Sequence, residues 1–375
     1  MSITTEIKEF AWQIGFDLVG ISTAEPLAGA EAVVVERVRA GLFGGMDWLT
    51  EDRARLACRP QELLPAARSI ISVACSYLSD TPTVFGASAE PRGRIARYAW
   101  SRDYHDVLRD RMRLLVSFIE RRAGRRVESR LFVDTGPLVE RQLALRAGIG
   151  WYGKSTNILT RRYGSWVLLG EVFLDLDLDV DDPLQKSCGN CDACISACPT
   201  GAIASPYLVD SRRCISYLTI ELKGSVPPDL RPAMGSWIFG CDICQDVCPV
   251  NRRAKAGNHE FSQPLPQVES EPGLLSLLAL TVEDHREKFR ASPVWRAKRR
   301  GLIRNVAIAL ANAGDTAAVP ALARAMEDAE PLVRAHSAWA LGRLGSRQAR
   351  ETLELASARE TDESVRAEIK QALMS

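Results

Sequence analysis

The stretches SCGNCDACISACP, residues 187–199, and GCDICQDVCP, residues 240–249, decide the fold of this chain. Each stretch ends in Cys-Pro, and the second repeats only the last three cysteines of the first, because Ile238 stands where its leading cysteine would be. Cys214 lies between the two stretches and is expected to fill that vacancy. Together these eight cysteines are enough for two sites with four ligands each.

The spacing of the first stretch is that of bacterial ferredoxins, in which three cysteines bind one four-iron cluster and the fourth, before proline, binds the other. Applied to both stretches, this crossover predicts one [4Fe-4S] cluster bound by Cys188, Cys191, Cys194 and Cys248. It predicts a second [4Fe-4S] cluster bound by Cys198, Cys214, Cys241 and Cys244. A pair of zinc sites is the alternative, but zinc ribbons do not normally show paired Cys-Pro endings with a crossover partner.

The rest of the sequence indicates that these thiols are kept reduced. Residues 1–16 contain two glutamates and no export signal, and no apolar stretch reaches the roughly 20 residues of a membrane helix. We therefore expect a cytoplasmic protein without membrane contact, whose clustered cysteines are metal ligands rather than disulfides. Cys58 and Cys75 have no partners in the sequence and are expected to be structural.

Three ranges of different composition predict a multidomain α+β protein. Residues 1–180 alternate helical and strand patterns and predict an α/β catalytic domain. Residues 181–255 form the ferredoxin-like insert with the two clusters. In residues 256–375 a basic linker leads to a repeat in which Asn305–Leu310 recurs as His336–Leu341 after 31 residues. The period and the alanine- and leucine-rich faces predict HEAT-like helical repeats that pack on the rest of the chain.

Net charge restricts where a polyanion can bind. With 48 Lys and Arg against 47 Asp and Glu, the chain has a formal charge of +1, so a nucleic-acid site must be local. Residues 290–304 are the basic candidate, with Trp295 available for stacking and with the cations Arg290, Arg296, Lys298, Arg299, Arg300 and Arg304. Such a segment is either a phosphate-contact surface or an ordinary solvated helix face.

Several ordered motifs, taken together, resemble the epoxyqueuosine reductase family over nearly the whole chain. They are YAWSRDYH at 98–105, VDTGP at 133–137, GWYGKSTN at 150–157, the two cysteine stretches, and Ser292-Pro293 leading to Arg304-Asn305. The resemblance implies a cobalamin-dependent iron–sulfur enzyme that completes queuosine in the anticodon loop of transfer RNA. It further implies base-off cobalamin, an external low-potential electron donor, and transfer RNA docked on the basic segment and the repeats. We also expect a monomer.

The same resemblance assigns cobalamin contacts to Tyr104, His105, Lys154, Ser155 and Asn157. A histidine ligand to cobalt is not expected, because the Asp-x-His-x-x-Gly pattern has Leu108 in place of its glycine. His105 could equally be a core or capping residue. The loop at 150–157 could equally be a plain turn, and it lacks the glycine spacing of an ATP-binding loop.

Asp134 is the catalytic candidate. It follows an apolar strand and enters a glycine–proline turn, so on composition alone it would be a turn or capping residue. In the family the aspartate of this motif is the proton donor, and opening an epoxide with loss of its oxygen as water requires an acid. A desolvated carboxyl group has a raised pKa that would keep it protonated.

Two other functions are the alternatives for the whole chain. It could be a reductive dehalogenase-like cobalamin enzyme, or a non-catalytic iron–sulfur electron carrier.

Overall fold

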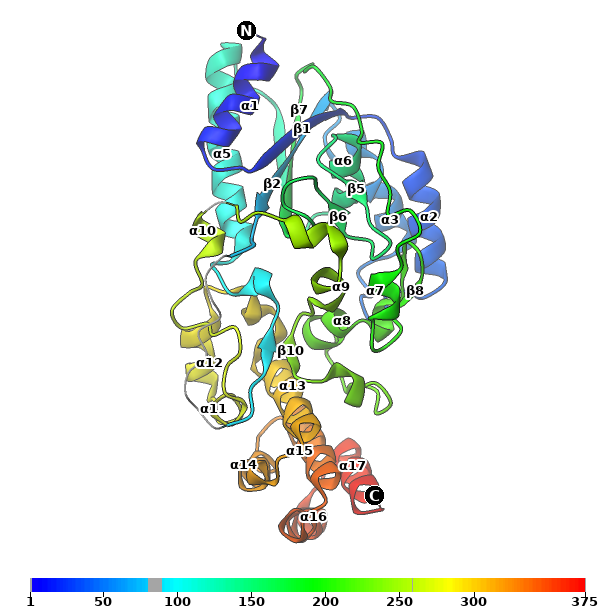
Figure 1. Cartoon of the computed structure of the whole chain (residues 1–375), viewed down its shortest axis with the longest axis vertical. Coiled ribbons are helices and arrows are strands. Elements are labelled where there is room, and N and C mark those ends of the chain that lie inside the picture. Colours follow the sequence, from blue (N-terminus) through cyan, green and yellow to red (C-terminus); the bar gives the residue numbers. More distant parts are fainter. Residues whose placement is uncertain (1, 80–89, 258, 375) are drawn as a thin grey trace. The chain divides into compact units, whose positions relative to one another are not determined.

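The computed structural model describes residues 2–79, 90–257 and 259–374 (Figure 1). The chain divides into two compact units, each built from three segments. The first unit comprises Met1–Thr81, Ser101–Arg212 and Ile243–Gln263. The second comprises Pro82–Trp100, Arg213–Asp242 and Pro264–Ser375. The units cut across the three predicted ranges, because the cysteine-rich insert contributes residues to both.

The first unit is built on a four-stranded sheet of order β1-β2-β7-β4. Its strands are β1 (Leu18–Thr23), β2 (Ser69–Ser76), β4 (Ser129–Phe132) and β7 (Val167–Leu174). Every neighbouring pair is antiparallel, so the sheet is not the parallel one of a βαβ fold. All eight residues of β2 are buried, as expected for a central strand covered on both faces.

Helices cover both faces of this sheet (Figure 1). On one face lie α1 (Ile3–Gln13) and the long α5 (Tyr104–Ala123), and Met112 of α5 comes so close that a Cβ on Gly170 of β7 would lie 3.1 Å from its sulfur. On the other face lies α6 (Glu140–Arg146), together with α2 (Ala28–Arg39), α3 (Glu51–Ala57) and α4 (Pro60–Leu63). The core therefore has two layers, one on each side of the sheet.

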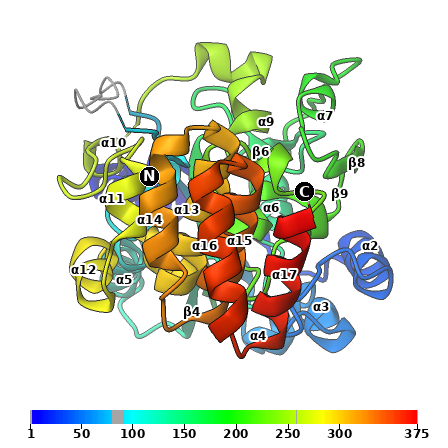
Figure 2. The same ribbon diagram turned by 90° about the horizontal axis from the view of Figure 1, so that it is seen from below.

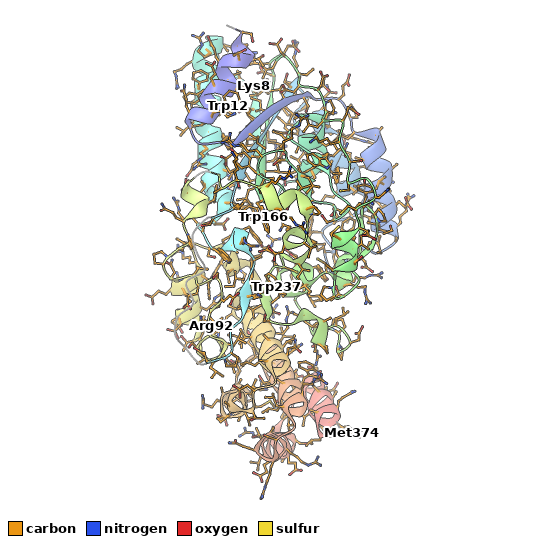
Figure 3. All side chains as sticks on the ribbon, in the orientation of Figure 1. Lys8, Trp12, Arg92, Trp166, Trp237 and Met374 are labelled. Carbon is orange, nitrogen blue, oxygen red and sulfur yellow. The ribbon has the colours of Figure 1, made fainter. Side chains whose placement is uncertain are left out.

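An acidic link, residues 175–182, leads from the sheet into the part of the cysteine-rich insert that belongs to the first unit. Lys8 of α1, labelled in Figure 3, pairs with Asp181 at 2.5 Å, and Asp181 also accepts a hydrogen bond from the Ile21 amide. Beyond the link lie α7 (Ala193–Ser196), the pair β8 (Ile203–Ser205) and β9 (Leu208–Val209), and later α9 (Ile243–Asp246) and α10 (His259–Ser262). A short hairpin of β5 (Trp151–Tyr152) and β6 (Ile158–Leu159) completes this unit.

The second unit contains the predicted repeats, which are helices α13 (Lys298–Ala313), α14 (Val319–Ala325), α15 (Pro331–Leu344), α16 (Arg347–Arg359) and α17 (Glu363–Met374). Figure 2 shows α15 between α13 and α17, in agreement with their packing contacts. Gly314 and Gly345 occupy the same left-handed position after α13 and α15, which explains why glycine recurs with the repeat. The α+β multidomain class with helical repeats is confirmed.

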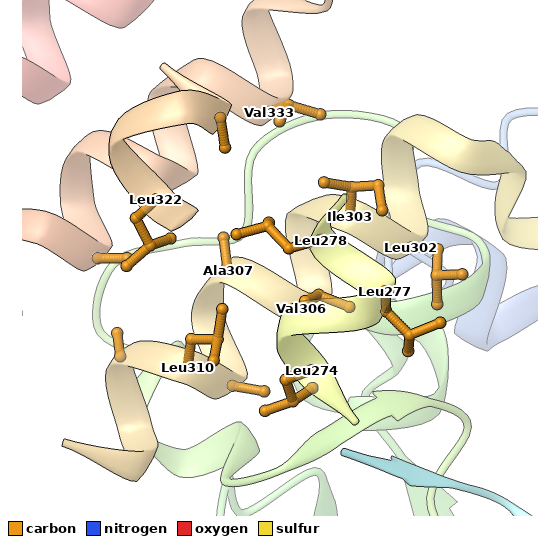
Figure 4. Close-up of a cluster of buried hydrophobic side chains, with 14 of the residues drawn as sticks. Leu274, Leu277, Leu278, Leu302, Ile303, Val306, Ala307, Leu310, Leu322 and Val333 are labelled. Carbon is orange, nitrogen blue, oxygen red and sulfur yellow. The ribbon is translucent and has the colours of Figure 1, made fainter. Parts of the chain in front are cut away.

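The repeats pack on the other segments of their unit. These are α8 (Ile215–Ile220), α11 (Leu274–Leu278), α12 (Val282–Phe289) and a parallel pair of β3 (Arg94–Ile95) and β10 (Trp237–Phe239). Figure 4 shows the core that results, in which Leu274, Leu277 and Leu278 of α11 meet the apolar face of α13. Burial of these side chains stabilises a short array that could not cover its own core.

Candidate functional site

The structure brings the first predicted set of cluster cysteines together in one unit. Cys188, Cys191 and Cys194 precede or lie on α7, Cys248 follows α9, and these two helices are in contact. Burial raises the pKa of the Cys194 thiol, and the neighbouring Cys188, Cys248 and Cys191 raise it further. Four thiols this close fit the donor set of a four-iron cluster, which binds through thiolates. Cys191 is the exposed member of this set.

The second predicted set is divided between the two units. Cys198 and Cys244 belong to the first, and Cys214 and Cys241 belong to the second. Burial alone would raise the pKa of Cys198, but hydrogen bonds from Thr200 and nearby backbone groups lower it below its ordinary value. The Asn157 side chain donates to the Cys244 sulfur at 3.7 Å. The donor chemistry of the four thiols fits a second cluster, and their use as one site stays a prediction.

The described residues contain no site for a single metal ion, and the two remaining cysteines are buried. Over residues 2–79, 90–257 and 259–374, no group of three or more His, Cys, Asp or Glu side chains is arranged to hold a single metal ion. Cys58 and Cys75 are fully buried, as expected for structural cysteines, and burial raises their pKa values to about 11 and about 12.

The candidate acid Asp134 lies on a tight loop two residues after β4. Its backbone is left-handed, with φ of 53°, which is uncommon for a residue other than glycine. The Asp134 amide donates to the Glu140 carboxylate, and the next turn is closed by the Thr135 amide on the Val133 carbonyl at 2.6 Å. Gly136 is required there, because a Cβ would lie 2.5 Å from the Phe132 ring. The loop leaves the Asp134 side chain 51% exposed.

His105 lies between two aspartates at the start of α5. Asp103 caps this helix and contacts His105 Nδ1 at 2.7 Å, while Nε2 lies 3.5 Å from Asp134 Oδ2. Burial opposes the charged imidazole, but hydrogen bonds to Asp103 and Asp134 outweigh it and raise the pKa of His105 to about 9. At neutral pH His105 is therefore positively charged beside Asp134. The helix cap is Asp103 rather than His105, and a cofactor contact of His105 stays a prediction.

Two glutamates behind Asp134 were not predicted from the sequence. Burial and the Asp134 charge raise the pKa of Glu140 to about 8. Glu171, in the middle of β7, is completely buried, and burial together with Glu140 and Asp134 raises its pKa well above its ordinary value. The sequence signal was present for Glu171, because it interrupts the otherwise apolar strand VLLGEVFL at 167–174. Glu140 gave no signal, because its contact depends on the fold of the loop.

The predicted cobalamin residues lie at two places in the first unit. Tyr104 stacks on His105 with ring centroids 4.2 Å apart, at the start of α5. Lys154, Ser155 and Asn157 lie on the turn between β5 and β6, where Thr156 is left-handed and Asn157 donates to Ser155. These hydroxyl, amide and ammonium groups fit the amide and phosphate groups of a corrin cofactor. The buried Trp151 indole N–H, which has no hydrogen-bond partner among the described residues, remains available to a ligand.

The basic segment is only partly free to contact RNA. Arg290, Lys298 and Arg300 are exposed, whereas Arg296 pairs with Glu221 at 2.5 Å and Arg299 pairs with Asp328 at 2.6 Å. Trp295 is partly buried, stacks on His285 and lies beneath Lys298.

Arg304 must be removed from the predicted RNA contacts. It is fully buried, and its guanidinium donates to the carbonyls of Leu218, Leu222 and Gly224. A fully buried guanidinium whose three nitrogens all donate inside the protein is not accessible to a phosphate.

Within the described residues, no helix is long and apolar enough to cross a membrane. Residues 187–251 match the family of 4Fe-4S double cluster binding domains, and residues 298–374 match HEAT repeats. The chain is therefore an iron–sulfur protein, and the predicted repeat type is confirmed. Residues 58–135 match the family described as "Epoxyqueuosine reductase QueG, DUF1730".

Whole-chain comparisons agree with these local matches. The epoxyqueuosine reductase of Escherichia coli K12 is 39% identical over 340 residues, which cover 90% of this chain and 89% of the relative. A solved epoxyqueuosine reductase with an epoxyqueuosine-modified tRNA-Tyr stem loop superposes with a TM-score of 0.92 at 34% identity, over 99% of this chain and 97% of that one. A Bacillus subtilis structure, with its catalytic aspartate loop swung out of the active site, gives 0.92 at 34% identity, over 99% and 98% of the two chains.

Identity above 30% over almost the whole of both chains shows common descent and a shared fold. The chain is an oxidoreductase, and it belongs to the epoxyqueuosine reductase family.

Proposed function

We propose that this chain reduces the epoxide of epoxyqueuosine to queuosine in the anticodon loop of a transfer RNA, with loss of the oxygen as water. The observation that carries the proposal is the half-exposed Asp134, held on a strained loop with its Oδ2 3.5 Å from Nε2 of His105. A solved family member binds an epoxyqueuosine-modified stem loop, and another is described with a catalytic aspartate loop. These relatives support the same substrate and the same acid here.

In this proposal Asp134 protonates the departing epoxide oxygen. The left-handed backbone and the hydrogen bond from the Asp134 amide to Glu140 hold the loop, and the carboxyl group is half-exposed, so a substrate can reach it. His105 is the positioning residue, because its Nδ1 is fixed by Asp103 and its Nε2 faces Asp134. Bound substrate would exclude water from Asp134, and desolvation favours the protonated acid. Strain of this kind is frequent at active sites.

Tyr104, His105, Lys154, Ser155 and Asn157 would hold base-off cobalamin, and the eight cluster cysteines would hold the two [4Fe-4S] clusters. When bound, these groups supply the two electrons of the reduction, which no side chain of the protein can provide. An external low-potential donor would replenish them. Exposed Arg290, Lys298 and Arg300, with Trp295 beside them, would contact the phosphates of the RNA. We also propose that the enzyme is a cytoplasmic monomer.

Mass spectrometry of the RNA tests this function directly. Anaerobic protein, loaded with cobalamin and reduced, is incubated with a stem loop that contains epoxyqueuosine. The expected product is queuosine, 16 Da lighter because one oxygen atom is lost overall. Unchanged RNA in the presence of intact clusters and a corrin spectrum would contradict the proposal. A purified protein that never acquires a corrin spectrum would instead favour an electron carrier.

A further inference from the structure

The reaction proposed above needs a second proton, and the following inference rests on that proposed function. Reduction of an epoxide to an alkene and water consumes two electrons and two protons. One proton is needed when the first C–O bond breaks and leaves a hydroxyl, and another is needed when the second C–O bond breaks and water departs. Asp134 carries only one proton, so the site must hold or import another.

Glu140 is in direct contact with the acid loop. It begins α6, and its carboxyl oxygen accepts the hydrogen bond of the Asp134 amide. The charged groups that act on Glu140 are Asp134 on the loop, His105 on α5 and Arg141 on α6, and Glu140 in turn raises the pKa of Glu171 on β7. Burial and the Asp134 carboxylate raise the pKa of Glu140 to about 8, although the hydrogen bond from the Asp134 amide and the two cations lower it, so Glu140 is largely protonated at neutral pH.

Glu171 lies behind Glu140 in the interior of the unit. It pairs across the sheet with Ser72 of β2 and Phe132 of β4. Because strand residues alternate in direction, Glu171 shares the face of Leu169 and Phe173, which pack with Ala144 and Leu143 of α6. Neither carboxyl oxygen has a hydrogen-bond partner within the described part of the chain, and the side chain has no solvent exposure. An ionised carboxylate at such a position is very costly, so Glu171 keeps its proton.

We propose that Glu140, backed by Glu171, stores the second proton of the reaction and delivers it through Asp134. Asp134 first gives its proton to the oxygen of the opening epoxide and becomes a carboxylate. The O–H bond of Glu140 then breaks as an O–H bond forms on Asp134, and Asp134 protonates the hydroxyl that leaves as water.

Two carboxyl groups thus lose one proton each, the substrate gains two protons and two electrons, and solvent restores both acids after product release. Glu171 stays neutral throughout and so adds no negative charge to those of Glu140 and Asp134. Because Glu140 acts through Asp134, it is a positioning and proton-supplying residue and does not touch the substrate.

Single-turnover kinetics of Glu140→Gln test this inference. Glutamine keeps an oxygen that accepts the Asp134 amide, but it has no proton to release. With cobalamin-loaded, fully reduced enzyme and epoxyqueuosine stem loop, the wild-type rate should fall as pH rises through about 8, where Glu140 loses its proton. The variant should be slower by about tenfold to a hundredfold at pH 7, less than the roughly 10² to 10⁴ of a direct general acid, because Glu140 acts through Asp134. It should lack the decline near pH 8, whereas any decline near pH 9, where His105 loses its proton, is common to both enzymes.

Two further variants separate proton supply from structure. Glu140→Asp restores a titratable acid and should recover the alkaline decline even if its rate is reduced. Glu120→Gln is the matched control, because Glu120 also accepts a backbone amide, from Val127, near the opposite end of α5 from His105. It should match wild type at every pH.

The possible outcomes are distinct. A Glu140→Gln rate equal to wild type, or one lowered equally at every pH with the alkaline decline intact, overturns the proton-store role. Wild-type enzyme that forms no queuosine overturns the proposed function, and this inference with it.

Discussion

Arg304 in the second unit and Glu171 in the first are both fully buried, but their polar atoms are satisfied in opposite ways. In the second unit, all three guanidinium nitrogens of buried Arg304 donate hydrogen bonds, and the neighbouring Asn305 donates to the carbonyls of Thr219 and Ile238. Buried His336 is neutral, because burial and Arg231 lower its pKa to about 3, and it accepts the Val226 amide. In the first unit, buried Glu171 has no such partner among the described residues.

This difference separates a structural use of buried polarity from a chemical one. A satisfied buried group holds segments together and has no remaining capacity for a ligand. An unsatisfied acid costs stability, and a protein keeps one where a proton is needed. Arg304 of the basic segment therefore stabilises the fold, whereas the loop at 133–137, next to Glu140 and Glu171, contains the candidate catalytic residue Asp134.

The largest expected effect is that of Asp134→Asn. Asparagine tolerates the left-handed backbone, and its backbone amide can still donate the hydrogen bond to Glu140, so only the acid is lost. Turnover on epoxyqueuosine RNA should fall by about 10² to 10⁴, the usual contribution of a general acid. Iron content and visible spectra should not change. Asp106→Asn, at an exposed position on the first turn of α5, is the control, and equal activity of both variants would remove Asp134 from the mechanism.

Removal of a satisfied buried group should instead reduce stability. Arg304→Ala leaves three carbonyls and Asn305 without their donor and opens a cavity, so the free energy of unfolding should fall by about 3 kcal/mol or more. Thermal unfolding of the purified protein measures this loss. Exposed Arg300→Ala should unfold at the wild-type temperature. If both variants unfold alike, Arg304 is not a structural anchor.

Glu171→Gln should increase stability, and the increase should depend on pH. The folded-state pKa of Glu171 is raised, so its contribution is fully present below about pH 4.5 and is lost as pH rises through the ordinary range toward the folded value. Neutral glutamine avoids this loss. The gain should be small at pH 5 and on the order of 2 kcal/mol at pH 8, by comparison of unfolding midpoints. A gain that is independent of pH would show that Glu171 is ionised or hydrated.

The smallest effect is expected on RNA affinity. Lys298→Ala and Arg300→Ala should each weaken stem-loop binding a few-fold and reduce the salt-dependence slope by about 1, because each removes one phosphate contact. Arg113→Ala, at an exposed position on α5 outside the basic segment and the repeats, is the control, and filter binding at several salt concentrations makes the comparison. Unchanged slopes for Lys298 and Arg300 would identify their segment as a solvated face.

Regular patterns in the sequence predicted much of the fold and part of the candidate site. The cysteine spacing predicted the iron–sulfur insert, and the 31-residue recurrence with Gly314 and Gly345 predicted the stacked helices. These signals can be read locally, because metal ligands, helix caps and buried helix faces each require particular residue types at fixed short spacings. Asp134 was identified only through the family resemblance, because on composition alone it would be a turn or capping residue; the structure adds that its turn needs Gly136.

Burial and partner choice between distant residues were decided by the tertiary structure. Arg304 looks like any surface cation in a basic run until α13 packs against residues 218–224 and occupies its donors. Glu140 and Glu171 acquire their raised pKa values only when α6 folds onto the sheet beside Asp134. A sequence specifies which groups are present, but the free energy of each charge depends on the solvent and partners that the folded chain leaves around it.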